Sequence, residues 1–222
     1  MNRSVFWALV RKDLYLMRGL MIAAPVAALI ATVVMGLGKV GFAVGGVLFL
    51  TTSMASAIFI AAISLTGERK EQSRLFTLSL PISGNHHDLA KLLAAYLAYV
   101  IPWLALTLIA VLVFLLHAGS DRGMVVYAAM LQGFVLMLFS CAVAAFYVIK
   151  SEALYGVAIL TVNIAFTLFM IKIDQPDVIK PLSTDVIVWT PFAQAMLAGE
   201  ALTLAAALAF VLSAISRHRD HV

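Results

Sequence analysis

The stretch "LAKLLAAYLAYVIPWLALTLIAVLVFLLH", residues 89–117, decides the fold. Lys91 is the only Lys, Arg, Asp or Glu in this stretch, and the other residues are almost all apolar. A membrane-spanning helix needs about 20 mainly apolar residues, because the hydrocarbon core is about 30 Å thick and each residue adds about 1.5 Å. The stretch therefore predicts a helix that crosses a bilayer.

The composition of the whole chain agrees with this prediction. Its 222 residues are 64% hydrophobic and 12% charged, whereas soluble domains are roughly 45 to 50% apolar. We predict an all-α integral membrane protein, a single transmembrane domain over 1–222 with six spanning helices. The other five spans are placed at 19–37, 40–66, 124–149, 153–171 and a last segment that ends near residue 216.

The last apolar region, 186–216, is too long and too interrupted for one straight span. Pro191, Gly199 and Glu200 fall inside it. We therefore predict an outer loop and short outer helix over 172–199, followed by the sixth span. Thr190 is placed to cap this short helix, since Pro191 suits the first helical position. Glu200 would then lie near the outer interface.

Lysine and arginine set the orientation, because they favour cytoplasmic loops. With the N-terminus inside, 11 of the 15 lie on the cytoplasmic side and four lie outside. We predict a multi-pass protein of the cell inner (plasma) membrane with both termini in the cytoplasm. This topology explains the net charge of +4, so no nucleic-acid partner is expected.

The segment "GERKEQSRLFTLSLPIS", 67–83, mixes both signs of charge with bulky apolar residues. Its charges would cost on the order of 10 kcal/mol in hydrocarbon, so the cytoplasmic segment 67–88 must lie outside the bilayer. It is either a solvated hairpin or a short helix that docks on a separate protein. The candidate docking residues are Glu68, Arg69, Glu71, Arg74, Leu75, Phe76, Leu78, Leu80 and Pro81.

Residues 3–18 have the pattern of an amphipathic helix that lies in the cytoplasmic interface. Asp13 falls within its apolar arc. An unpaired carboxylate there is costly, so Asp13 either meets a cation from a neighbouring element or turns to water.

Polar residues within the spans are few. Thr52 and Ser56 share one face of the second span, and Asn163 and Thr167 repeat that spacing in the fifth. Packing explains Ser and Thr adequately, but the Asn163 amide needs a partner helix or a wet cavity. The sequence has no phosphate-binding loop, HExxH or GxSxG motif. We expect no enzyme and no metal site, and the lack of buried acids argues against proton-coupled transport.

Three features together resemble the membrane subunits of type 2 ABC transporters, in particular short six-helix permeases similar to exporters of amphipathic peptides or antibiotics. They are "LVRKDLYLMR" at 9–18, the six spans, and "ERKEQSRLFTLSLPIS" at 68–83. Permeases of that family often carry a Lys-Asp pair in an N-terminal elbow helix, here Lys12 and Asp13, and a Leu-Pro-Ile-Ser type sequence at 80–83. The stretch "TPFAQAMLAGEAL" at 190–202 is similar to their short outer helix.

The resemblance implies the permease subunit of an exporter that moves an amphiphile, such as a peptide, antibiotic or lipid, out of the cytoplasm. It implies a second copy or a homologous permease, and separate ABC ATPase subunits that bind ATP and Mg. Segment 67–88 would be the coupling helix seated on the ATPase, and Thr52, Ser56, Asn163 and Thr167 would line the pathway. The alternative is a stand-alone immunity or scaffold protein of the membrane whose loop is an ordinary hairpin.

Overall fold

The computed structural model describes residues 3–66, 84–116, 121–149 and 151–217, and within them it is helical, without a strand. Among these described residues, six helices are long and apolar enough to cross a membrane, which confirms the predicted all-α class and the six spans. The elements are α1 (Arg3–Met35), α2 (Lys39–Thr66), α4 (Gly84–Leu116), α5 (Met124–Val148), α6 (Glu152–Ile173), the short α7 (Pro176–Ile179) and α8 (Pro191–Arg217).

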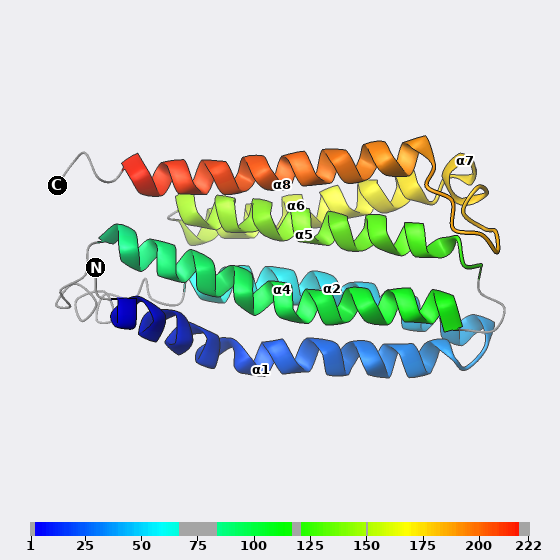
Figure 1. The fold of residues 1–222 in the computed structure, drawn as a ribbon, viewed down its shortest axis with the longest axis horizontal. Helices are drawn as coiled ribbons and strands as arrows, with labels where there is room; N and C mark the ends of the chain where they lie inside the picture. Colours follow the sequence, from blue (N-terminus) through cyan, green and yellow to red (C-terminus); the bar gives the residue numbers. More distant parts are fainter. Residues whose placement is uncertain (1–2, 67–83, 117–120, 150, 218–222) are drawn as a thin grey trace.

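The long helices run side by side along one axis (Figure 1). The start of α1 and the end of α8 lie at the same end of the bundle, here called the termini end. The opposite end, which holds α7, is here called the loop end. An even number of spans places both ends of a chain on the same side of a membrane. The positions of the two ends in this structure agree with six spans.

Helix α5 forms the centre of the bundle and packs against α2, α4, α6 and α8, while α1 packs against α2 and α4. The core beside it is aromatic. Phe139 of α5 stacks on Tyr99 of α4, with ring centroids 4.1 Å apart, and Phe134 stacks on Phe169 of α6 at 3.7 Å. Such large buried rings supply much of the packing energy in helix bundles.

Two glycines let α1 and α2 approach closely after the tight turn between them. A Cβ at Gly41 would collide with the backbone of Val34, and one at Gly45 with the backbone of Ala31 and Met35. Small residues at helix contacts are the usual means of close packing in membranes. The turn itself uses Gly38, whose φ of 95° is unfavourable for other residues.

The N-terminal segment differs from the prediction of a separate elbow helix over 3–18. The structure joins it to the first span as α1, a single helix of 33 residues. Gly19 at the expected break costs a helix only about 1 kcal/mol, too little to end it. The helix is about 50 Å long, longer than the hydrocarbon core, and Figure 1 shows its first turns inclined to the rest.

The predicted short outer helix also continues without a break, so α8 runs from Pro191 to Arg217 as one helix. Thr190 caps it as predicted, because its Oγ1 accepts a hydrogen bond from the backbone N–H of Ala193 at 3.2 Å. The separate short helix of this region is instead α7, between α6 and α8. Gly199 does not end α8, since one helical glycine is tolerated when the helix packs on a neighbour.

Candidate functional site

Residues 67–83 of the predicted coupling segment 67–88, with all nine candidates from Glu68 to Pro81, lie outside the described residues, whereas residues 84–88 form the start of α4. The helices that flank it are described: α2 ends at Thr66 and α4 begins at Gly84, both at the termini end (Figure 1). Any force applied to the segment therefore passes into α2 and α4.

At this end α1 is fixed to α2. The side-chain oxygen of Ser64 lies 2.9 Å from the sulfur of the buried Met17. The Asp13 carboxylate of α1 is 3.8 Å from the Lys12 ammonium, and its side chain is only 14% exposed. Asp13 thus lies largely within the protein, in ion-pair distance of its own neighbour in the chain.

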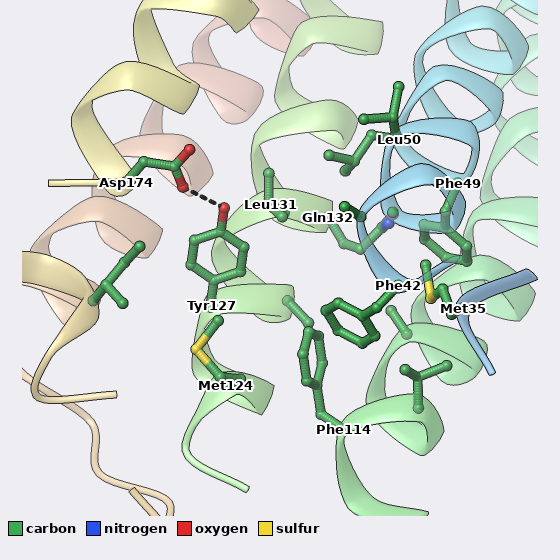
Figure 2. Close-up of a pocket in the computed structure, with 17 residues that line it drawn as sticks. Met35, Phe42, Phe49, Leu50, Phe114, Met124, Tyr127, Leu131, Gln132 and Asp174 are labelled. Atoms are coloured by element: carbon green, nitrogen blue, oxygen red, sulfur yellow. Dashed lines mark hydrogen bonds between the residues drawn. The ribbon is translucent and has the colours of Figure 1, made fainter. Parts of the chain in front are cut away.

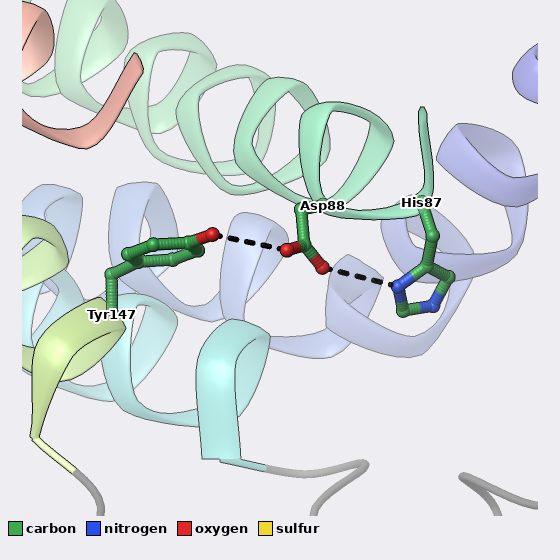
Figure 3. Close-up of polar contacts among 3 residues, drawn as sticks. All are labelled: His87, Asp88 and Tyr147. Carbon is green, nitrogen blue, oxygen red and sulfur yellow. Dashed lines mark hydrogen bonds and ion pairs between the residues drawn. The ribbon is translucent and has the colours of Figure 1, made fainter. Parts of the chain in front are cut away.

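A second contact ties the start of α4 to the end of α5 (Figure 3). The Tyr147 hydroxyl donates a hydrogen bond to Asp88 Oδ2 at 3.0 Å, and His87 Nδ1 lies 3.4 Å from Asp88 Oδ1. This pairing was not predictable from a local pattern, because Tyr147 is 59 residues away from Asp88. This hydrogen bond therefore joins the start of α4 to the end of the central helix α5.

The four predicted pathway residues do not lie on one surface. Ser56 is buried inside the protomer and donates to the backbone oxygen of Ser53 at 2.9 Å. Thr52 is half-buried and donates to the oxygen of Leu48. Asn163 and Thr167, by contrast, are exposed on α6, where each donates to the backbone carbonyl four residues earlier at 2.9 Å.

Asn163 and Thr167 belong to a continuous exposed stripe at helical spacing, here called the α6 stripe. Its members are Leu160, Asn163, Ile164, Thr167, Leu168 and Ile171. Only 6% of the most apolar stretch of α6 is buried within the protomer. A polar amide on such a face is costly against lipid tails, so the stripe marks a surface for another helix or for water.

Sequence reasoning missed a buried polar layer formed by Ser53, Gln132 and Glu200 of α2, α5 and α8. Gln132 Nε2 donates to Ser53 Oγ at 3.3 Å, and Trp103 Nε1 donates to the Gln132 backbone oxygen at 2.9 Å. Gln132 Oε1 has no hydrogen-bond partner among the described residues.

Glu200 corrects the expectation that the spans hold no buried acid. It is 5% exposed, and neither carboxylate oxygen has a partner in the part of the chain that the structure describes. Its carboxylate occupies the space that a side chain at Gly133 of α5 would fill. Helix phase was the available signal, because Ala193, Leu197 and Glu200 recur at the spacing of one face.

An apolar cavity of about 440 Å³ lies between α2, α4 and α5 at the loop end (Figure 2). Its walls include Phe42, Phe49, Phe114 and Leu131. Polar groups lie at its margins: Gln132, and the Tyr127 hydroxyl, which donates to Asp174 Oδ1 at 2.7 Å. Sequence reasoning did not find this cavity, since its walls come from four separate parts of the chain.

These features define a polytopic helical membrane protein whose central helix and exposed polar stripe suit a transporter subunit. The family model described as "ABC-2 family transporter protein" matches residues 8–216. The chain therefore belongs to the ABC-2 transporter family and is a permease of that type, which implies association with an ABC ATPase subunit and dimerisation in general. Comparisons with curated proteins and with solved structures find no match.

Proposed function

We propose that the chain is the transmembrane subunit of an exporter that carries an amphiphile, such as a peptide, antibiotic or lipid, out of the cytoplasm. Separate ATPase subunits bind ATP and Mg and hydrolyse the nucleotide, while this chain is not an enzyme. The termini end faces the cytoplasm of a cell with the protein in its inner (plasma) membrane. Two permease chains, identical or homologous, enclose the pathway between them.

The observation that carries this proposal is the α6 stripe. Helix α6 buries almost none of its surface in its own protomer and exposes Asn163 and Thr167. It therefore needs a second surface that contacts its apolar residues and its two polar side chains. A facing copy of the same stripe supplies apolar contact from Leu160, Ile164 and Leu168 and leaves the amide and hydroxyl for a polar cargo group.

The coupling path supports the same proposal. Segment 67–83 would dock on the ATPase through Leu75, Phe76 and Leu78, with charged neighbours around this apolar patch. Closure of the ATPases would then press on the ends of α2 and α4. The Asp88–Tyr147 hydrogen bond would carry the movement from α4 into α5, against which α6 and α8 pack.

Copurification with the partner ATPase tests the proposed docking. We expect simultaneous replacement of Leu75, Phe76 and Leu78 by Ser to abolish copurification of a tagged ABC ATPase coexpressed with the permease. The matched control replaces Val186, Ile187 and Val188 by Ser, since these three apolar residues are exposed in the connection before α8. Unchanged copurification with the first variant would favour the stand-alone immunity or scaffold protein.

The pathway is tested by Asn163→Leu in the intact complex. We expect a changed cargo profile in vesicles together with changed cargo-stimulated ATPase activity, because the amide leaves the pathway wall. Thr203→Leu is the control, since Thr203 is also an exposed threonine but lies on α8. An unchanged cargo profile in Asn163→Leu would mean that Asn163 serves in packing and does not line the pathway.

A further inference from the structure

The cavity between α2, α4 and α5 is a preformed apolar site within one protomer. Its volume of about 440 Å³ lies in the range of small-molecule sites, about 300 to 1,000 Å³. On α5 it is lined by Met124, Tyr127, Ala128 and Leu131, which recur at helical spacing. Figure 2 shows the rings of Phe42 and Phe114 close together beside Leu131 and Met124.

The cavity lies within one leaflet. Along α5 it extends from Met124 to Gln132, about 12 Å of helix, which is less than half of a hydrocarbon core of about 30 Å. Asp174 and Ile179, from the connection after α6, border it at the loop end, whereas Gln132 and Leu50 border it towards the middle of the bundle. An elongated occupant would therefore stand roughly parallel to the helices.

The cavity opens sideways through α2. Val47 lines it and is nevertheless 64% exposed, so its wall continues onto the outer surface of the bundle. Beside it, Gly46 also lines the cavity, and a Cβ at this position would meet no atom within 4 Å. A hydrocarbon chain of the surrounding bilayer can enter through this gap, whereas the polar layer at Ser53 and Gln132 limits its depth.

The two margins differ in charge. Asp174 is an exposed carboxylate at the loop end, and its Oδ1 is held by the Tyr127 hydroxyl. A headgroup that carries an ammonium would be favoured there over a purely anionic one. At the other margin no charged residue lines the cavity among the described residues.

We propose that this cavity binds one acyl chain of a phospholipid from the leaflet at the loop end, with an ammonium headgroup beside Asp174. The chain enters between the helices at Gly46 and Val47 and ends below Gln132. An apolar cavity left unfilled forfeits dispersion contacts along its walls, and a lipid chain restores them. The site is separate from the proposed pathway and needs neither ATPase nor nucleotide.

Photolabelling tests this inference on the full chain in nanodiscs of phosphatidylethanolamine and phosphatidylglycerol. The probe is phosphatidylethanolamine with a diazirine on one acyl chain, placed near the headgroup or at mid-chain. After irradiation, peptide mass spectrometry locates the adducts. We expect the first probe to label the level of Tyr127 and the second the level of Leu50 and Leu131. Even labelling of every exposed helix would overturn the proposal.

Gly46→Leu places a bulky side chain at the opening, where a Cβ meets no atom within 4 Å. We expect it to lower adduct formation in the cavity by about tenfold, a change of the order seen when a binding contact is lost. Gly156→Leu is the matched control, because a Cβ at Gly156 of α6 also meets nothing within 4 Å and Gly156 does not line the cavity. Thermal unfolding confirms that both variants fold. Undiminished labelling in folded Gly46→Leu would overturn the site.

The headgroup is tested with Asp174→Asn, which removes the charge and keeps the shape. We expect the labelling ratio of a phosphatidylethanolamine probe to a phosphatidylglycerol probe to fall about threefold. An unchanged ratio would refute the role of Asp174. Because no ATPase is present, failure here leaves the export proposal standing, and failure of the copurification test leaves the lipid site standing.

Discussion

Helices α5 and α6 are equally apolar but occupy opposite positions in the protomer. The most apolar stretch of each helix has a mean hydropathy of 2.1. In α5, 67% of this stretch is buried within the protomer, whereas in α6 only 6% of it is buried. The polar residues follow this difference: Gln132 and Ser140 of α5 are buried, whereas Asn163 and Thr167 of α6 are exposed. Hydropathy therefore identifies a span but does not distinguish a scaffold helix from one that faces a partner.

The largest expected effect comes from emptying the core on α5. Phe139 is 1% exposed and stacks on Tyr99, so Phe139→Ala should lower the free energy of unfolding by about 3 to 5 kcal/mol. The matched change on α6, Ile164→Ala, should cost less than about 0.5 kcal/mol, because Ile164 is 52% exposed. Denaturant titration in detergent measures both. Similar losses at the two positions would break the contrast between the helices.

A smaller effect is expected where α5 receives movement from α4. Tyr147→Phe removes the hydroxyl that donates to Asp88 and should lower stability by about 2 kcal/mol, as for hydrogen bonds to charged groups. In the assembled transporter it should also weaken the coupling of ATP hydrolysis to export. Tyr15→Phe is the control, because Tyr15 is exposed on α1. A loss of coupling in both variants would argue against the α4–α5 route.

The smallest expected effect is an increase in the free energy of unfolding. Glu200 is buried between α8 and α5 with no described partner for its carboxylate. Glu200→Met, which fits the same space without a polar group, should therefore stabilise the fold by about 1 kcal/mol. Gln194→Met, at an exposed position of α8, should change stability by less than about 0.5 kcal/mol. Destabilisation by Glu200→Met would mean that the carboxylate is paired in the assembled protein.

The sequence was sufficient for the six spans, because apolar runs of the required length are a strong local signal. The Thr190 cap was also predictable from the pattern Thr-Pro before a helix. Two helix boundaries were predicted wrongly, because neither Gly19 nor Gly199 breaks its helix. Tertiary packing outweighs a helix propensity difference of about 1 kcal/mol.

The site residues depended on contacts between distant parts of the chain. A polar residue such as Asn163 is visible in an apolar span, but which way it faces depends on how α6 packs. Ser56 turned out to be buried in the protomer. Gln132, Glu200 and the lipid-sized cavity escaped prediction because their surroundings combine α2, α4, α5 and α8, whose relative rotation no local pattern specifies.

Disulfide cross-linking through the α6 stripe tests the central claim most directly. Cys141 is the only cysteine of the chain, so Cys141→Ala gives a background for Thr167→Cys on the stripe and for Leu108→Cys, an exposed control on α4. In membranes that contain the complete transporter, Thr167→Cys should form a permease dimer on mild oxidation, with a yield that changes when ATP is bound. Cross-linking at Leu108→Cys but not at Thr167→Cys would contradict a pathway enclosed by two α6 helices.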